Sequence, residues 1–145
     1  QFKKWADDYF FIKHRNETRG IGGIFFDRLS SQEAYEKEQL WQFVLSLGSG
    51  FLPIYTELIS RNRDRPFTKA QQDWQYLRRG RYVEFNLVLD KGTKFGLDTD
   101  GRTESILMSL PPFASWEYNH QPELESPEAK TLAYLVKDLD WINHD

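Results

Sequence analysis

The sequence of 145 residues contains no cysteine. It therefore excludes disulfide bonds, thiolate nucleophiles, and zinc or iron–sulfur centres with cysteine ligands, and it fits a reducing compartment. No apolar run approaches the length that a membrane span needs, and no signal-peptide pattern opens the chain, so we expect no membrane span. The chain also lacks an excess of basic residues. There are 19 of them against 22 acidic residues, and the resulting net charge of −3 argues against a nucleic-acid partner.

Aromatic residues, by contrast, are abundant, at 16% of the chain. Such rings bury large areas, so we expect a compact core within one domain. The chain opens on Gln1 rather than on methionine, and its first letters resemble the middle of a helix that leads into a strand. We therefore expect residues 1–145 to be the C-terminal part of a single larger domain, with the preceding half absent.

The pattern predicts both helices and strands. A helix is expected near residues 1–9, and further helices are expected after the capping residues Ser31, Thr68 and Ser126. The helix that starts at Ser31 is expected to be interrupted at "GSG", and the helix that starts at Thr68 is expected to stop at Gly80. Strands are predicted at 9–15, 21–29, 82–89 and 104–111, joined mainly by short turns. This order predicts an α+β fold, an antiparallel sheet with helical layers packed on it.

The first chemical cluster is "HRNETR", which places His14 beside Arg15, Glu17 and Arg19. A histidine at a strand end can ligate a metal or transfer protons near neutral pH. A metal site, however, needs three or four converging ligands, and the other two histidines show no ligand spacing with His14. The residues alone favour a surface hairpin with ordinary ion pairs.

The second cluster is "RGIGG" followed by "IFFD". A glycine-rich loop binds phosphate where it opens a helix, but here it opens a predicted strand. The glycines leave room for a flat ligand against the sheet, and Asp27 can accept hydrogen bonds from the ligand's N–H groups. The alternative, that Asp27 simply starts a turn, remains equally open.

Arginines form the third and fourth features. Arg78, Arg79 and Arg81 surround Gly80, and the turn "TDGR" delivers Arg102 to a predicted strand edge. Arginine forks match carboxylates in pairs, although both groups also fit a solvated helix end or turn. Together these features indicate an anionic planar ligand and specify no reaction.

Three segments then narrow the interpretation. "KKWADDYFFIKHRNETRGIGGIFFD", "LRRGRYVEFNLVLDKGTKFGL" and "GRTESILMSLPP" resemble the oxygen-dependent coproporphyrinogen III oxidases. The resemblance runs in order over essentially the whole chain and corresponds to the C-terminal half of that family. One departure is Ala6, where cysteine is frequent in the family.

The resemblance implies an enzyme of haem biosynthesis. Such an enzyme converts two propionates of coproporphyrinogen III to vinyl groups, gives protoporphyrinogen IX, and releases carbon dioxide and hydrogen peroxide. It uses dioxygen as co-substrate and no organic cofactor, with a divalent metal cation as an open question. The resemblance also implies a broad, flat antiparallel sheet sandwiched between helices, and a homodimer that forms through the region from Tyr82 to Glu117.

The resemblance further assigns roles to individual residues. Asp27 is expected to organise the pyrrole N–H groups and assist proton loss, with Arg19 as a second catalytic candidate. Asp100, Gly101 and Arg102 are expected to contact the substrate. The same contact is implied for Arg81, and His14 is implied as a metal ligand whose partner ligands lie in the missing half.

Two further expectations concern location and an alternative function. The absence of a leader favours the cytoplasm, or the mitochondrial intermembrane space if a presequence has been removed. The alternative to an enzyme is a catalytically silent module that binds tetrapyrroles or drives dimerisation.

Overall fold

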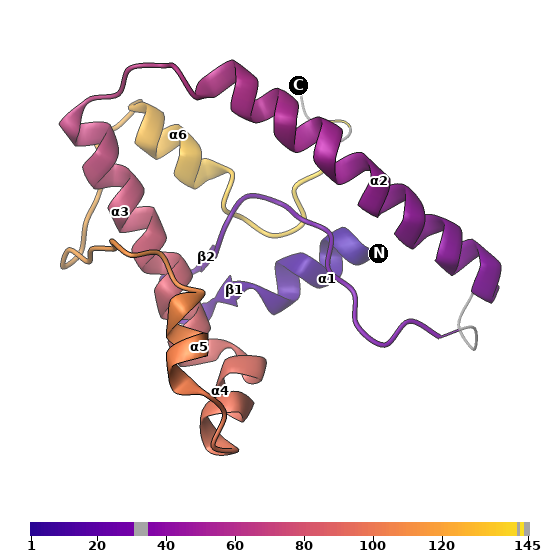
Figure 1. The fold of residues 1–145 in the computed structure, drawn as a ribbon. Coiled ribbons are helices and arrows are strands. Elements are labelled where there is room, and N and C mark those ends of the chain that lie inside the picture. Colours follow the sequence, from indigo (N-terminus) through magenta and orange to yellow (C-terminus); the bar gives the residue numbers. More distant parts are fainter. Residues whose placement is uncertain (31–34, 142, 144–145) are drawn as a thin grey trace. The chain divides into compact units, whose positions relative to one another are not determined.

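The computed structural model describes residues 1–30, 35–141 and 143 (Figure 1). The chain divides into two compact units. Unit 1 comprises Gln1–Phe25 and Thr68–Asp145, and unit 2 comprises Phe26–Phe67. The helix start predicted at Ser31 lies outside the described residues.

Unit 1 is mostly helical. It contains helix α1 (Phe2–Tyr9), strand β1 (Phe11–Ile12), a 3-10 turn η1 (Lys13–Arg15), strand β2 (Glu17–Thr18), helix α3 (Lys69–Glu84), a π-helix η2 (Phe85–Leu89), and helices α4 (Lys91–Asp98), α5 (Thr103–Met108) and α6 (Pro127–Ala133). Strands β1 and β2 pair antiparallel, with Phe11 opposite Thr18. Asn16 closes the hairpin with a φ of 53°, a left-handed conformation that asparagine tolerates well.

The core of unit 1 forms where α1, the hairpin and the end of α3 meet. Its buried apolar side chains are Ala6, Ile12, Leu77, Val83, Phe85 and Leu135. Aromatic rings extend this core, because Tyr9 stacks on Phe25 at 4.6 Å between ring centroids and Phe10 packs against Phe85 at 5.4 Å. A backbone hydrogen bond of 2.9 Å from the Thr18 N–H to the Leu135 carbonyl ties the C-terminal segment to the hairpin.

Local capping signals predicted two helix starts correctly. Thr68 accepts a hydrogen bond from the Gln71 N–H at 3.2 Å and starts α3, and Ser126 accepts one from the Ala129 N–H at 3.1 Å and starts α6. Pro127 occupies the first turn of α6, where the missing N–H costs nothing. The helix at residues 2–9 is also confirmed. Helix α3, however, passes through Gly80 and ends at Glu84.

The strand predicted at 82–89 is wrong, because these residues complete α3 and form the π-helix η2. Apolar and polar residues alternate along 82–87, and the apolar residues Val83 and Phe85 are buried as they would be on one face of a strand. A strand, however, must pair its backbone groups with a neighbour, and the described residues of unit 1 provide no partner strand beside this segment. A helix satisfies those groups locally, as in the i→i+5 hydrogen bond of 2.9 Å from the Asp90 N–H to the Phe85 carbonyl.

The other predicted strands also differ from the structure. "DKGT" is not a hairpin turn. Asp90 instead caps α4 by accepting a hydrogen bond from the Thr93 N–H at 2.7 Å. The segment 104–111 mostly forms α5, and 21–29 has no regular structure. The described residues therefore form a mostly helical fold with one small antiparallel sheet, which is compatible with the α+β class, whereas the large predicted sheet is not observed among them.

Unit 2 is dominated by helix α2 (Lys37–Asn62), which continues through the "GSG" that was expected to interrupt it and through Pro53. Two glycines cost a helix about 1 kcal/mol each, which 26 residues can tolerate. By length and composition alone, α2 could cross a membrane, although no membrane span was predicted from the sequence. Its large exposed side chains are Trp41, Leu45, Leu47, Phe51, Leu52, Ile54, Tyr55, Leu58 and Ile59. Among the described residues of unit 2, no side chain is buried.

Candidate functional site

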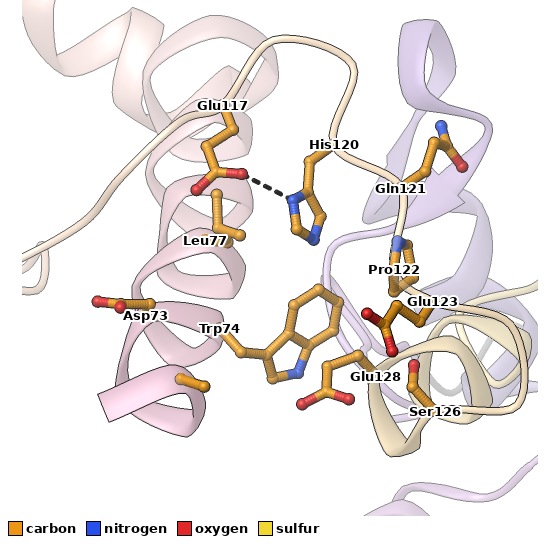
Figure 2. A pocket seen from close by; sticks show the side chains of 11 residues that line it. Asp73, Trp74, Leu77, Glu117, His120, Gln121, Pro122, Glu123, Ser126 and Glu128 are labelled. Carbon is orange, nitrogen blue, oxygen red and sulfur yellow. Dashed lines mark hydrogen bonds and ion pairs between the residues drawn. The ribbon is translucent and has the colours of Figure 1, made fainter. Parts of the chain in front are cut away.

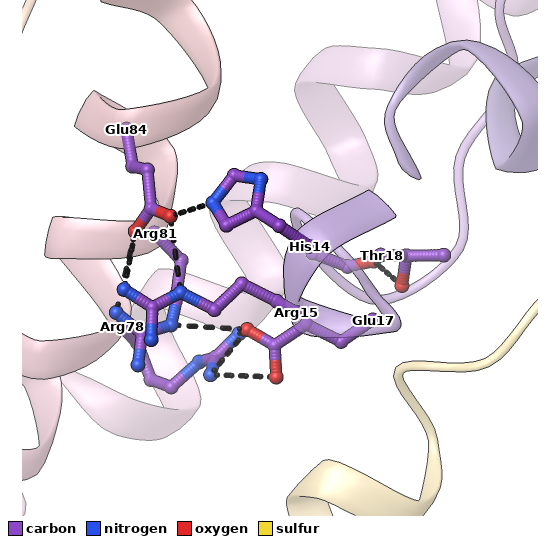
Figure 3. Close-up of polar contacts among 8 residues, drawn as sticks. His14, Arg15, Glu17, Thr18, Arg78, Arg81 and Glu84 are labelled. Atoms are coloured by element: carbon purple, nitrogen blue, oxygen red, sulfur yellow. Dashed lines mark hydrogen bonds and ion pairs between the residues drawn. The ribbon is translucent and has the colours of Figure 1, made fainter. Parts of the chain in front are cut away.

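Glu84, at the end of α3, is the centre of a polar cluster (Figure 3). Its carboxylate contacts the imidazole Nε2 of His14 and accepts hydrogen bonds from Arg15 Nε at 3.0 Å and Arg15 Nη2 at 3.1 Å. Arg81 Nη1 lies 3.4 Å from the second carboxylate oxygen. Only 10% of the Glu84 side chain is exposed, so one shielded carboxylate joins η1 to α3.

Glu17, on β2, forms the second half of the cluster. Arg78 Nη1 and Nη2 each lie 3.2 Å from Glu17 Oε1, and Arg81 Nε lies 3.2 Å from the same oxygen. The angle at Arg81 Nε is unfavourable, which leaves this buried N–H without a hydrogen bond among the described residues. Arg81 thus bridges both glutamates while the residue itself is only 8% exposed.

The cluster carries excess positive charge. Three arginines face two carboxylates, before any proton on His14 is counted. Burial raises the pKa of Glu84, but the hydrogen bonds from Arg15 and His14, together with the charges of Arg15 and Arg81, hold that pKa below its ordinary value of 4.5. Burial lowers the pKa of Arg78, against the attraction of Glu17. The local field therefore favours an additional anion.

Arg19 lies in an aromatic cage. Its guanidinium carbon lies 4.0 Å from the ring centroid of Phe10, 5.0 Å from that of Tyr82 and 5.2 Å from that of Phe85. Burial lowers the pKa of Arg19, partly offset by the charge of Asp90. The described residues provide no carboxylate within 4.0 Å of this guanidinium, so cation–π contacts hold it and leave its donors for another acceptor.

The predicted substrate turn lies between α4 and α5. Asp100 has a φ of 55°, and the Gly101 N–H donates to the Gly96 carbonyl at 2.8 Å. A Cβ on Gly101 would overlap that carbonyl, so only glycine fits this turn. Arg102 follows as the residue before α5, exposed and without a carboxylate partner among the described residues. The turn thus presents a guanidinium to solvent.

Asp27 belongs to unit 2, whereas every other predicted site residue belongs to unit 1. Its carboxylate is 66% exposed and lies 3.9 Å from Arg28 Nε of the next residue. Arg28 has a φ of 52°, so the chain turns sharply just after Asp27. The expected role of Asp27 at the pyrrole N–H groups stays a prediction.

The structure brings two of the predicted site residues, His14 and Arg81, onto one carboxylate. The predictions missed that carboxylate, Glu84, because residues 82–89 were interpreted as a strand. In a strand, Glu84 would lie on the face opposite Val83 and Phe85. A helical interpretation would have found it, since Arg78, Arg81 and Glu84 follow the i, i+3 spacing of one helix face. Glu17 contacts Arg78 and Arg81 only because β2 lies against α3, and the spacing of residues in the sequence does not reveal that contact.

A separate hollow of about 380 Å³ lies beside α3 (Figure 2). The Trp74 ring lies 5.9 Å from the His120 ring, and His120 Nδ1 lies 2.7 Å from a Glu117 carboxylate oxygen. Further carboxylates line it, from Asp73, Glu123 and Glu128. The negative charge of these carboxylates repels an anionic ligand, so this hollow does not suit the kind of ligand that the arginine cluster favours.

Comparison with known proteins identifies the family. The family model for coproporphyrinogen III oxidase matches residues 1–141. The chain belongs to the coproporphyrinogen III oxidase family. It is 53% identical over 142 residues to the chloroplastic oxygen-dependent coproporphyrinogen-III oxidase of barley, Hordeum vulgare, and 54% identical over 142 residues to that of soybean, Glycine max. Each match covers 98% of this chain and 36% of the relative.

The chain spans about a third of the length of these coproporphyrinogen III oxidases. The expected cytoplasmic or mitochondrial location is contradicted, because both relatives are chloroplastic enzymes.

A divalent metal does not fit the residues of this chain by themselves. Among the described residues, no three histidine, aspartate or glutamate side chains gather closely enough to hold an ion. His14 and Glu84 supply at most two ligands, and Arg15 and Arg81 already compensate the Glu84 charge. We therefore derive no chemical step through a metal.

Proposed function

We propose that this chain is part of an oxygen-dependent coproporphyrinogen III oxidase. The reaction converts two propionate side chains to vinyl groups, giving protoporphyrinogen IX for haem biosynthesis. For each side chain, one dioxygen takes up two hydrogens as hydrogen peroxide while one carbon dioxide leaves. The proposal is supported chiefly by more than 50% identity over 98% of the chain to enzymes of that name.

The polar residues of unit 1 suit a substrate with several carboxylates. Arg102 is exposed and unpaired among the described residues, and Arg19 keeps its donors free within its aromatic cage. We assign Arg102, presented by Asp100 and Gly101, to a propionate. The expected substrate contact of Arg81 stays a prediction, and its guanidinium already contacts Glu17 and Glu84. Its direct role is to hold β2 and η1 on α3, and so to position Arg19.

Asp27 is assigned to the pyrrole nitrogens. An exposed carboxylate can accept hydrogen bonds from several N–H groups of a macrocycle, and it can accept a proton as a pyrrole becomes electron-rich enough to react with dioxygen. Arg19 then stabilises the negative charge that develops on the substrate. No organic cofactor enters this scheme, and dioxygen is the oxidant.

The role of Asp27 is tested in the full-length enzyme. Loss of a general base typically lowers kcat by about 10²–10⁴-fold, and we expect this for Asp27→Ala with a smaller change in KM. Asp64→Ala is the control, since Asp64 is another exposed aspartate of unit 2 that contacts a neighbouring arginine. Near-normal turnover by Asp27→Ala would remove Asp27 from the mechanism.

Arg102 is tested through substrate binding. Loss of one charged hydrogen-bond pair costs about 1.5–3 kcal/mol, so Arg102→Ala should raise KM by about 10- to 150-fold. Arg63→Ala, at another exposed arginine, is the control. An unchanged KM for Arg102→Ala contradicts the assignment.

A silent binding module is the second candidate, because the chain spans only about a third of its relatives. Coproporphyrinogen III is added without oxygen to the 145-residue chain and to the full-length protein, and air is then admitted. Vinyl products from the full-length protein support the oxidase. Binding without products from the full-length protein supports the module.

The role of His14 as a metal ligand also remains a proposal. It requires ligands from outside this chain, because the described residues do not complete a site. The test compares the metal content of the full-length protein with that of its His14→Ala variant. If His14 is a ligand, the variant should bind less metal.

We further propose a homodimer through the region from Tyr82 to Glu117. This region exposes many large apolar side chains: Tyr82, Leu87, Val88, Phe95, Leu97, Leu107, Met108, Phe113 and Trp116. Exposed apolar surface of this extent is typical of an interface. Sedimentation of full-length Phe95→Ser should show a monomer, whereas Phe51→Ser on α2 should not change the dimer.

The broad sheet of the family is proposed for the full-length protein. The described residues of this chain supply only the two short strands β1 and β2, so we propose that the other strands of the sheet come from the rest of the full-length protein. Infrared spectra of the amide I region, recorded for the chain and for the full-length protein, compare their strand contents, and an equal share of strand in both contradicts the proposal.

A further inference from the structure

A second cavity of unit 1, about 450 Å³ in volume, lies between α1, the hairpin and the π-helix η2. Its walls are largely aromatic. They comprise Trp5, Tyr9, Phe11, Phe85 and Leu89. This volume falls in the range of about 300–1,000 Å³ that is typical of small-molecule sites.

The walls of this cavity are held in place by their neighbours. Tyr9 stacks on Phe25 at 4.6 Å, and its hydroxyl donates to Asp90 Oδ1 at 2.9 Å. Phe85 is 2% exposed and packs against Phe10 at 5.4 Å. A ligand would therefore meet preformed aromatic surfaces and would not have to order them.

The π-helix η2 supplies two wall residues, Phe85 and Leu89, from opposite ends of its single turn. Because π-helices are rare and are frequently found at functional sites, its position here supports a binding role. Asp90 ends the turn and caps α4, and Lys91 follows directly at the cavity.

The charges at the cavity select the ligand. Lys13 and Lys91 line it, both are exposed, and neither has a carboxylate partner within 4.0 Å among the described residues. Asp8 also lines it, but its carboxylate accepts a hydrogen bond from Lys137 at 2.8 Å and lies 3.8 Å from Lys4. Asp90 lies close by and is occupied by Tyr9 and the Thr93 N–H. The ammonium groups of Lys13 and Lys91 are therefore the charges left to meet a ligand.

We propose that this cavity binds a flat aromatic compound that carries a carboxylate. The half-buried rings of Trp5 and Tyr9 contact the ligand's planar body, and Lys13 and Lys91 bind its carboxylate. The acidic hollow beside Trp74 offers the opposite charge and does not compete for such a ligand. Two sources fit this chemistry: a propionate-bearing ring of a tetrapyrrole, or an independent small aromatic acid.

The test measures binding of 1-pyrenebutyrate to the 145-residue chain by fluorescence anisotropy, with the uncharged alcohol 1-pyrenebutanol as the matched probe. Two exposed charge contacts together favour the carboxylate by on the order of tenfold. We expect Lys13→Gln/Lys91→Gln to remove this preference while its affinity for the alcohol stays unchanged. Lys94→Gln, an exposed lysine of α4 outside the cavity, should keep the preference. High salt should weaken it.

Two results overturn the proposal: equal affinity of the chain for both probes, or an unchanged preference in Lys13→Gln/Lys91→Gln. Leu89→Trp gives a second readout, because the larger side chain fills the cavity and should weaken the binding of both probes. Competition by coproporphyrin III identifies the source. If coproporphyrin III displaces 1-pyrenebutyrate, and this displacement requires Lys13 and Lys91, the ligand is a tetrapyrrole. If coproporphyrin III does not displace the probe, the ligand is a separate aromatic acid. Only this competition rests on the proposed function, and oxidase assays of Asp27→Ala test that function independently.

Discussion

Gly80 offers the sharpest test of how unit 1 packs. It lies buried within α3, where the Ser115 N–H donates to the Tyr76 carbonyl at 3.0 Å. A Cβ at position 80 would overlap the Ser115 carbonyl oxygen and lie 3.4 Å from Cε2 of Trp116. Backbone atoms cannot rotate away as the end of a flexible side chain can, so Gly80→Ala must push the segment around Ser115 off the helix.

The magnitude follows from three contributions. Overpacking costs about 1–3 kcal/mol, and loss of the Ser115–Tyr76 hydrogen bond costs about 0.5–1.5 kcal/mol. Alanine regains about 1 kcal/mol through its higher helix propensity. We therefore expect Gly80→Ala to lower the free energy of unfolding by roughly 0.5–3.5 kcal/mol, although an isolated helix would be stabilised by the same change.

The measurement is urea denaturation of the chain followed by circular dichroism, with the m-value checked for constancy. Gly20→Ala is the control in the same unit, since nothing lies within 4 Å of its Cβ position. That change should stabilise the chain by about 0.4–1 kcal/mol. If Gly80→Ala is as stable as the unmodified chain, residues near Ser115 do not pack on α3 as described.

Three further predictions concern polar contacts of the chain. Glu84→Gln leaves shielded arginines without their counter-charge, so it should lower the free energy of unfolding of unit 1 by about 2–4 kcal/mol in urea denaturation. Glu57 is exposed, so Glu57→Gln should change that free energy by less than about 0.5 kcal/mol. The pKa of Glu84 is lowered, so its contribution is complete above its ordinary value of 4.5 and is lost as the pH falls through the folded-state pKa. The stability gap between Glu84→Gln and the unmodified chain should therefore close in acid, and a constant gap argues against the ion pairs. Thr68→Ala should cost about 1 kcal/mol in thermal denaturation, while Thr68→Asn, which keeps a capping oxygen, should not.

Sequence patterns predicted features that depend on a few neighbouring residues. The caps at Thr68 and Ser126 each need only an oxygen near an N–H three residues later, so the local sequence determines them. The predictions failed where two conformations suit the same letters. Val83 and Phe85 are buried in a helix as they would be in a strand, and pairing with distant residues decides between the two.

The candidate site shows the same division. The sequence located the arginines and His14, because their clustering is visible in the order of residues. It did not reveal their partners, since Glu17 meets Arg78 across 61 positions and Glu84 meets His14 across 70. Asp27 and Arg102 were also singled out from the order of residues, but their specific roles come from the family resemblance and await the experiments above.

The exposure of α2 has a consequence for its dynamics. Because none of the described residues of unit 2 is buried, its amide hydrogens are protected only by the helix's own hydrogen bonds. Pro53 removes one of these bonds in mid-helix, which lowers the barrier to local opening there. Deuterium uptake in α2 should therefore be rapid and independent of mutations that destabilise unit 1, whereas the amides of Ile12 and Phe85 should exchange only when unit 1 unfolds as a whole.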